Sequence, residues 1–214
     1  MSEYSTIGVL KKDGTVEMSN CRYGGKLLGV GETLLNNYND ASKVNELISH
    51  GSIKRLGIDS ATCEKYMGEQ KTSLFANLDD YKEAWKSENN YLFDEEGKKW
   101  YYSKQRSKGG FEPLEKETID SAKEDLLKHY IACYDHSPYE TELNKQRIEE
   151  SILKGVSFDN AKSKIRQFEL DGAHSHTITE KLAFAESVYL RNKLLSQCVI
   201  KTQNTSKPKA RMKI

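Results

Sequence analysis

The sequence predicts an α+β fold in which two β-hairpins with short helices precede an all-helical C-terminal region. Two β-favouring runs flank the Asp-Gly pair at residues 13–14, and two more flank an acidic turn that ends in glycine at residues 94–97. Asp-Gly between such runs is a strong hairpin signal. Beyond residue 113, apolar residues recur at helical spacing with no further strand pattern. We therefore expect an α+β domain at 1–113, a helical region at 114–200 and a basic, disordered tail at 201–214.

The first hairpin leads through a glycine-rich segment into a helix. Its predicted strands are residues 7–10 and 15–19, and four glycines follow within residues 24–31. Val30, Leu34 and Tyr38 have the i, i+4, i+8 spacing of one helix face. Glycine permits positive φ and close backbone approach, which favours a tight structural turn here. Amides ahead of a helix could instead bind an anion, but the segment lacks both GxxxxGK[ST] and a convincing GxGxxG.

The middle of the first region contains weaker patterns. Asp40 has the position of an N-cap for a helix whose inner face is Val44, Leu47 and Ile48, and Gly51 can end that helix. We expect a short strand at 53–56, a loop at 58–77 and a helix beginning at Leu78-Asp79 that contains Tyr81, Ala84 and Trp85.

The second hairpin is predicted from residues 91–93 and 100–102, both rich in aromatic side chains. Side chains alternate between the faces of a strand, so Tyr91, Phe93, Trp100 and Tyr102 are expected to share the inner face.

Four helices are expected in the C-terminal region, beginning at Thr118, Ser137, Ser157 and Thr177. Ser137-Pro138-x-Glu140 and Thr177-x-x-Glu180 are capping boxes, and Gly155 and Gly172 are stops. Helices without an intervening strand predict a bundle or a helical extension. In chain order, the expected inner residues are Ile119, Ala122, Leu126, Tyr130 and Ile131, then Leu143, Ile148 and Ile152, then Ala161, Ile165 and Phe168, then Ile178, Leu182, Ala185, Tyr189 and Leu194.

The first half of the chain carries a series of short motifs. They are Ile7-Gly8, Asp13-Gly14, Cys21, Tyr23-Gly24-Gly25, Gly29-Val30-Gly31, Leu34-Leu35 and Tyr38, then Lys43-Val44-x-Glu46-Leu47-Ile48, Gly51, Leu56-Gly57 and Asn90-Tyr91-Leu92-Phe93. In these motifs the chain resembles a family of small, mostly uncharacterised proteins of bacteriophages and other mobile bacterial DNA. Where that family has His-Trp-Asp-Gly-Tyr-Pro character, this chain has Arg22-Tyr23-Gly24-Gly25-Lys26-Leu27, so no role of the missing Asp is carried over. The resemblance implies a phage source and no established activity.

Composition indicates a soluble, polar protein, with 36% hydrophobic and 30% charged residues among 214. No apolar run reaches the ~20 residues of a membrane span, and the N-terminus lacks signal-peptide character. Cys21, Cys63, Cys133 and Cys198 are far apart and form no CxxC pair, as expected of reduced thiols. We expect a cytoplasmic location (the host cytoplasm for a phage protein) and no membrane partner.

Charge is distributed unevenly. Residues 201–214 hold five Lys or Arg and no acid, whereas residues 1–200 hold 28 basic and 32 acidic residues, a net charge of −4. The tail could contact RNA, DNA or an acidic partner, and a solubilising tail is the simpler interpretation.

Three sets of residues are candidates for chemistry. Cys21 precedes the glycine-rich segment, where amides could lower a thiol pKa, and His50 is the nearest candidate base; a small buried residue is the favoured alternative. His129, Cys133 and His136 have i, i+4, i+7 spacing, which suits a metal on one helix side, although ordinary packing explains Cys133 and no fourth ligand is evident. We expect no metal and no other cofactor.

The third set follows the second hairpin turn and consists of Lys98, Lys99, Trp100, Tyr102, Lys104 and Arg106. Cations with interleaved aromatic rings are typical of single-strand binding surfaces, and such a surface could equally contact a protein partner. A half-buried strand with a solvated edge gives the same pattern, and the acidic turn opposes phosphate.

These sequence features lead to three hypotheses about function. The leading one is a non-enzymatic phage-type accessory protein that binds a host macromolecule, most simply a host protein, in counter-defence or host takeover. The alternatives are a nucleic-acid-binding accessory protein and a Cys/His-dependent enzyme. The choice of a non-enzymatic protein rests on the lack of any recognisable nucleophile, base and orienting group at suitable spacing.

Overall fold

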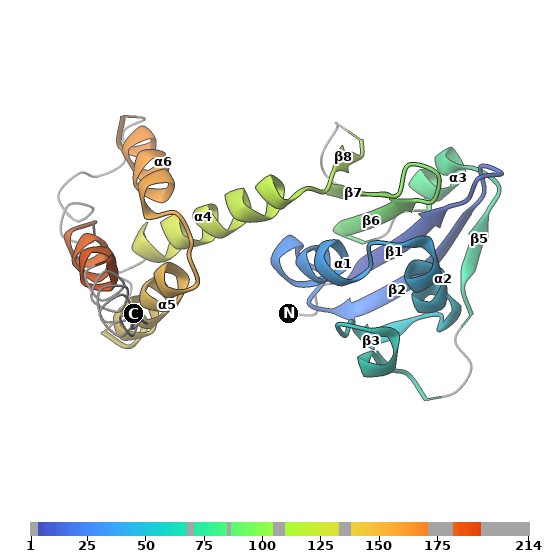
Figure 1. Cartoon of the computed structure of the whole chain (residues 1–214), viewed down its shortest axis with the longest axis horizontal. Helices are drawn as coiled ribbons and strands as arrows, with labels where there is room; N and C mark the ends of the chain where they lie inside the picture. Colours follow the sequence, from blue (N-terminus) through green and yellow to red (C-terminus); the bar gives the residue numbers. More distant parts are fainter. Residues whose placement is uncertain are drawn as a thin grey trace, which may run out of the picture. The chain divides into compact units, whose positions relative to one another are not determined.

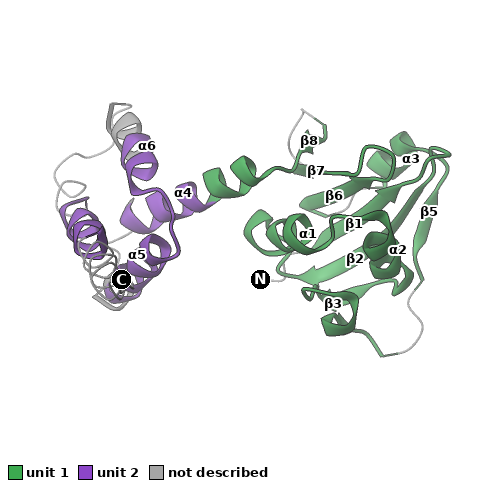
Figure 2. Cartoon of the chain, in the orientation of Figure 1, with its two compact units in different colours: residues 1–122 green, residues 123–214 purple. Residues whose placement is uncertain are grey.

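The computed structural model describes residues 4–67, 71–84, 87–104, 110–132, 138–170 and 182–193. The chain consists of two compact units, Met1–Ala122 and Lys123–Ile214 (Figure 2). Strands and short helices form the first unit, and helices form the described part of the second (Figure 1). The predicted fold class, α+β followed by a helical region, is confirmed.

One mixed sheet organises the first unit. Its strands in the described residues are β1 (Ser5–Leu10), β2 (Val16–Tyr23), β3 (Ile53–Arg55), β4 (Glu64–Lys65), β5 (Ser73–Phe75), β6 (Asn89–Asp94), β7 (Lys99–Lys104) and β8 (Glu112–Pro113). Their order is β4-β3-β2-β1-β6-β7-β8, and β5 pairs with the first residues of β2.

Both predicted hairpins are present, as β1–β2 and β6–β7. In the first turn Gly14 has φ +86°, and the Asp13 carboxylate accepts a hydrogen bond of 3.0 Å from the Thr15 amide. The hairpins are joined by parallel pairing of β1 with β6, which sets Ile7 opposite Tyr91. This long-range parallel pair makes a single sheet out of two local structures.

Short helices connect the strands. They are a π-helix at Leu27–Gly31, α1 (Glu32–Asn37), α2 (Ala41–Ser49), a 3₁₀ helix at Ser60–Thr62 and α3 (Leu78–Glu83). Asp40 caps α2 as predicted, because its carboxylate accepts a 3.0 Å bond from the Lys43 amide. Gly51 follows α2 with φ +66°, the left-handed conformation that its position requires.

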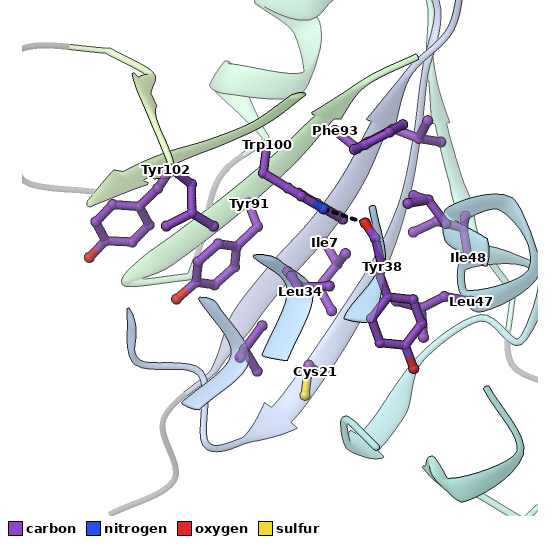
Figure 3. Packing of buried hydrophobic residues seen from close by; sticks show 14 of the residues in the cluster. Ile7, Cys21, Leu34, Tyr38, Leu47, Ile48, Tyr91, Phe93, Trp100 and Tyr102 are labelled. Carbon is purple, nitrogen blue, oxygen red and sulfur yellow. Dashed lines mark hydrogen bonds between the residues drawn. The ribbon is translucent and has the colours of Figure 1, made fainter. Parts of the chain in front are cut away.

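The main core lies between the sheet and the helices α1 and α2 (Figure 3). Val30, Leu34 and Tyr38 are buried there, as their spacing predicted. The inner face of the second hairpin is also as predicted: Tyr91, Phe93, Trp100 and Tyr102 all belong to this core.

The opposite sheet face has a smaller core beside α3. Val16, Leu92 and Tyr81 form its centre, and Tyr101 packs at its margin. The Thr6 hydroxyl lies 2.9 Å from the Tyr81 hydroxyl and donates a 2.9 Å bond to the Asn90 side-chain oxygen. The buried polar groups of Thr6, Asn90 and Tyr81 are therefore paired across three segments.

Two predictions for the first unit need correction. Residues 58–77 are not simply a loop, because they contain a 3₁₀ helix and the strands β4 and β5. Each of these elements is only two or three residues long, too short for a periodicity to appear. The helix α3 begins at Leu78 as predicted, capped by the Asn77 side chain, which accepts from the amides of Asp79 and Asp80; it ends at Glu83, before the predicted Ala84. Trp85 lies outside the described residues.

The second unit is helical, and α4 links it to the first. Its helices are α4 (Lys116–Ala132), α5 (Pro138–Leu153), α6 (Phe158–Leu170) and residues 182–193. Its core contains Leu127, Ile131, Ile148, Ile152, Phe158, Ala161, Ala185 and Val188. Ser157 caps α6, since its hydroxyl accepts a 3.3 Å bond from the Asn160 amide. No helix among the described residues is both long and apolar enough to cross a membrane.

The details of α4 differ from the prediction. The helix begins at Lys116, two residues before the predicted start. The Thr118 hydroxyl accepts a hydrogen bond from the amide of Glu115, the residue before the helix, so Thr118 lies inside the first turn and is not the N-cap. Ile119 and Ile131 are buried as predicted, but the buried leucine is Leu127, whereas the predicted Leu126 is 37% exposed. Leu114 and Ile119 belong to the main core, so the first unit extends past residue 113 to Ala122. The Thr177 capping box and the tail at 201–214 lie outside the described residues.

Candidate binding surface

Cys21 lies within β2, in the main core, with no exposed surface. Its thiol donates to the backbone carbonyl of Tyr23 at 3.5 Å, and the Lys54 carbonyl lies 4.0 Å from the same sulfur. Burial raises the pKa of Cys21 to about 11, so the thiol is protonated at neutral pH. His50 follows α2, and its Nε2 atom is buried without a hydrogen-bond partner among the described residues. The structure thus forms no Cys21–His50 pair and gives Cys21 the environment of a packing residue.

The glycine-rich segment is held by its own backbone. The amides of Gly29 and Val30 donate 2.9 Å bonds to the carbonyls of Lys26 and Gly24, and the Gly31 amide donates to the Lys26 carbonyl at 3.4 Å. These donors are already occupied and do not point to a free anion site. A Cβ on Gly29 would lie 2.3 Å from the Gly24 oxygen, and one on Gly31 would lie 3.1 Å from the Tyr91 ring. The glycines therefore allow close packing.

The predicted aromatic surface on the second hairpin is turned inward. Trp100 is 3% exposed, and its indole nitrogen donates a 2.6 Å bond to the Tyr38 carbonyl (Figure 3). Tyr102 is 9% exposed; its hydroxyl donates to the Asn89 side chain, and its ring stacks on Tyr91. Buried in this way, neither ring presents an open face on which a base could stack. Lys98, Lys99 and Lys104 are exposed, and Arg106 lies outside the described residues.

The proposed metal ligands are described only in part. His129 is exposed on α4 with its ring 6.2 Å from that of Tyr130. Cys133 and His136 lie outside the described residues. Among those that the structure does describe, no three His, Cys, Asp or Glu side chains converge as a metal site would require.

A different cluster gathers at one end of the sheet, and we call it the Tyr/Arg surface. It consists of Tyr4, Arg22, Tyr23, Lys54 and Tyr66. The strands β1, β2, β3 and β4 are successive neighbours, which brings together segments that are far apart in the sequence. Ser5 pairs with Cys21, and Cys21 pairs with Ile53, so the residues beside these pairs are also neighbours.

Aromatic rings surround the cations of this surface. The Arg22 guanidinium lies 5.4 Å from the centre of the Tyr23 ring, and the Lys54 amine lies 5.7 Å from that of Tyr66. A hydrogen bond with the Tyr66 hydroxyl, and then the nearby Tyr23 and Tyr4 oxygens, raise the pKa of Arg22 above its usual value. Tyr4 is 46% and Tyr23 38% exposed. Such cation–π contacts hold charge and aromatic surface side by side.

The same end of the sheet is locally basic. Residues 20–27 and 52–66 together hold five Lys or Arg against two Asp or Glu, although residues 1–200 are acidic overall. Arg55 is paired with Glu64 at 3.7 Å. In the described part of the chain, neither Arg22 nor Lys54 forms an ion pair. Two cations among exposed rings are thus available to an anionic partner.

Local patterns could not reveal the Tyr/Arg surface, because its members span residues 4–66 and meet only through strand pairing. The one local signal is the Arg22-Tyr23 pair at the end of a predicted strand. Chemically, the surface can stack and pair with charge, and it contains no nucleophile with an adjacent base. Searches of protein-family models, curated proteins and solved structures each found no match to this chain.

Proposed function

We propose that this chain is a non-enzymatic binding protein that engages a macromolecular partner through the Tyr/Arg surface. The observation that carries the proposal is the exposure of Tyr4 and Tyr23 around Arg22. Tyrosine and arginine are enriched at interaction hot spots, because each offers a large contact area together with polar groups. Most other aromatic rings described in this unit are committed to its cores.

Two further observations support a binding role. The thiol of Cys21 is buried and protonated, and the amides of the glycine-rich segment bond to their own chain. The features that suggested chemistry therefore have packing roles. The resemblance of the first half to phage proteins supports a phage-type accessory protein, with a host macromolecule as partner and counter-defence or host takeover as the setting.

The test is affinity purification of the tagged full chain from bacterial cells, with and without nuclease treatment. We expect a partner to be recovered in stoichiometric amounts with the wild type and to be lost with the double variant Tyr4→Ala/Tyr23→Ala. Leu74→Ala is the matched control, because Leu74 is a 72% exposed apolar residue on β5, away from the Tyr/Arg surface. If the double variant keeps every partner of the wild type, the proposal is wrong.

A further inference from the structure

The Tyr/Arg surface occupies the part of a sheet face that the α3 core leaves open. Side chains alternate along strands, so Tyr4, Arg22 and Lys54 lie on the same face as Thr6 and Val16. Tyr23 starts from the other face, as the last residue of β2, and its ring lies 5.4 Å from the Arg22 guanidinium. At the other end of that face, Val16 and Leu92 are covered by Tyr81 of α3. At the open end, side chains form a row across the neighbouring strands β1 to β4. The row spans three strand spacings, about 14 Å.

The aromatic rings on this row match exposed bases. Every base has a π-face, so tyrosine rings on an open sheet can stack on a strand of any sequence. In a duplex those base faces are already stacked on their neighbours, which favours a single strand as the ligand. Tyr4 retains 46% of its surface for such contacts, and Tyr23, beside the row at the end of β2, retains 38%.

The charge of the row matches a phosphate backbone. Arg22 and Lys54 form no ion pair in the described part of the chain, and each lies over a tyrosine ring. A bound strand would bring phosphates to these cations while its bases meet the rings. An acidic protein segment would satisfy the cations but would leave the stacking faces of the rings without a matching group.

We infer that the Tyr/Arg surface binds single-stranded nucleic acid through base stacking on its tyrosines and phosphate contacts to Arg22 and Lys54. The inference rests on the proposed binding function and names its partner class. It also relocates nucleic-acid binding from the second hairpin, whose rings are buried, to the opposite end of the sheet order.

The experiment is fluorescence anisotropy of the full chain with labelled oligonucleotides of ~12 nucleotides, as single-stranded RNA, single-stranded DNA and duplex. At about 50 mM salt we expect the single strands to bind more tightly than the duplex. Tyr4→Ala and Tyr23→Ala should each weaken binding about fivefold or more, whereas Tyr4→Phe and Tyr23→Phe should retain it, since phenylalanine still stacks. Arg22→Gln and Lys54→Gln should each lower the salt slope by about one.

The controls keep the basic tail and change other surfaces. The double variant Lys98→Gln/Lys99→Gln removes exposed cations of the second hairpin turn, and Leu74→Ala removes exposed apolar surface; both should bind like the wild type. Thermal melts establish that each variant is folded.

The inference is overturned if the wild type binds no single strand at low salt, if it prefers duplex, or if binding is lost in the hairpin variant and kept in the tyrosine variants. A protein partner that is lost with Tyr4→Ala/Tyr23→Ala, together with no oligonucleotide binding, would retain the proposed function and overturn this inference alone.

Discussion

Cys21 shows at the scale of one residue how burial decides chemistry. A thiol near glycines and ahead of a helix resembles an activated nucleophile in the sequence. In the structure the side chain is fully buried, and its pKa rises to about 11 because the thiolate would lose its hydration. The reactive form is therefore scarce at neutral pH.

We expect Cys21 and Cys63 to resist alkylation in the native protein. Both are buried, Cys63 with 7% exposure, so iodoacetamide has little access to either sulfur in the folded chain. Peptide mapping by mass spectrometry after brief labelling should find both unmodified, and modified once urea has unfolded the chain. Labelling of Cys21 at the same rate in native and unfolded protein would contradict its packing role.

Trp100 is the second residue whose role changed with the structure. We expect Trp100→Phe to lower the free energy of unfolding by about 2 kcal/mol, because it leaves the Tyr38 carbonyl without its donor and opens space in the main core. Urea denaturation followed by circular dichroism measures the change. The adjacent exposed Lys99→Ala is the control and should shift stability by less than about 0.5 kcal/mol. If the two variants changed the free energy of unfolding equally, the indole hydrogen bond would not be important for stability.

Among the elements, the π-helix at Leu27–Gly31 explains the glycine pattern. The sequence indicated a helix face through Val30, Leu34 and Tyr38, and all three are buried. It could not indicate that Gly29 lies against the Gly24 carbonyl, because that contact depends on how the segment folds back on itself.

Gly29→Ala should destabilise the protein by about 2 kcal/mol. The added methyl would lie 2.3 Å from a backbone oxygen, so the π-helix or the preceding turn must shift. Asn36→Ala on α1 is the control, and it should be neutral or slightly stabilising since the position is exposed and alanine favours helix. Chemical denaturation compares the two. A Gly29→Ala protein as stable as the wild type would show that this close approach is not required.

Elements differ in how far local sequence predicts them. The α2 cap at Asp40 and the α6 cap at Ser157 were predictable, because a capping side chain bonds to an amide three residues away. The strands β4, β5 and β8 were not, because two or three residues become a strand only when a neighbouring strand supplies hydrogen bonds.

At the scale of the whole molecule, buried tyrosines link stability to alkaline pH. Burial raises the pKa of Tyr102 to about 12 and also raises that of Tyr38 and Tyr91, and Cys21 is shifted in the same direction. Each of these groups is neutral when protonated. Burial therefore favours the protonated form of each group, and the unfolded chain loses these protons at lower pH than the folded chain does.

The contribution of these groups to stability should be constant below about pH 9 and fall as pH rises through 9 to 12. In that window the native state binds more protons than the unfolded state, so each shifted group lowers the free energy of unfolding by up to about 1.4 kcal/mol per pH unit. Urea denaturation at a series of pH values measures the slope. Tyr102→Phe should make the slope shallower between pH 10 and 12. A stability that rises over this range would contradict the assigned burial.

The sequence by itself determined the fold class, both hairpins, the inner faces of the first two helices and the caps at Asp40 and Ser157, because each of these depends on residues close together in the chain. Tertiary structure alone decided that β1 pairs with β6 in parallel, that the Trp100 indole bonds to the Tyr38 carbonyl, and that Tyr4, Arg22, Lys54 and Tyr66 meet on one surface. The physical reason is sequence separation: the contacts that make a binding surface join segments whose local patterns carry no information about one another.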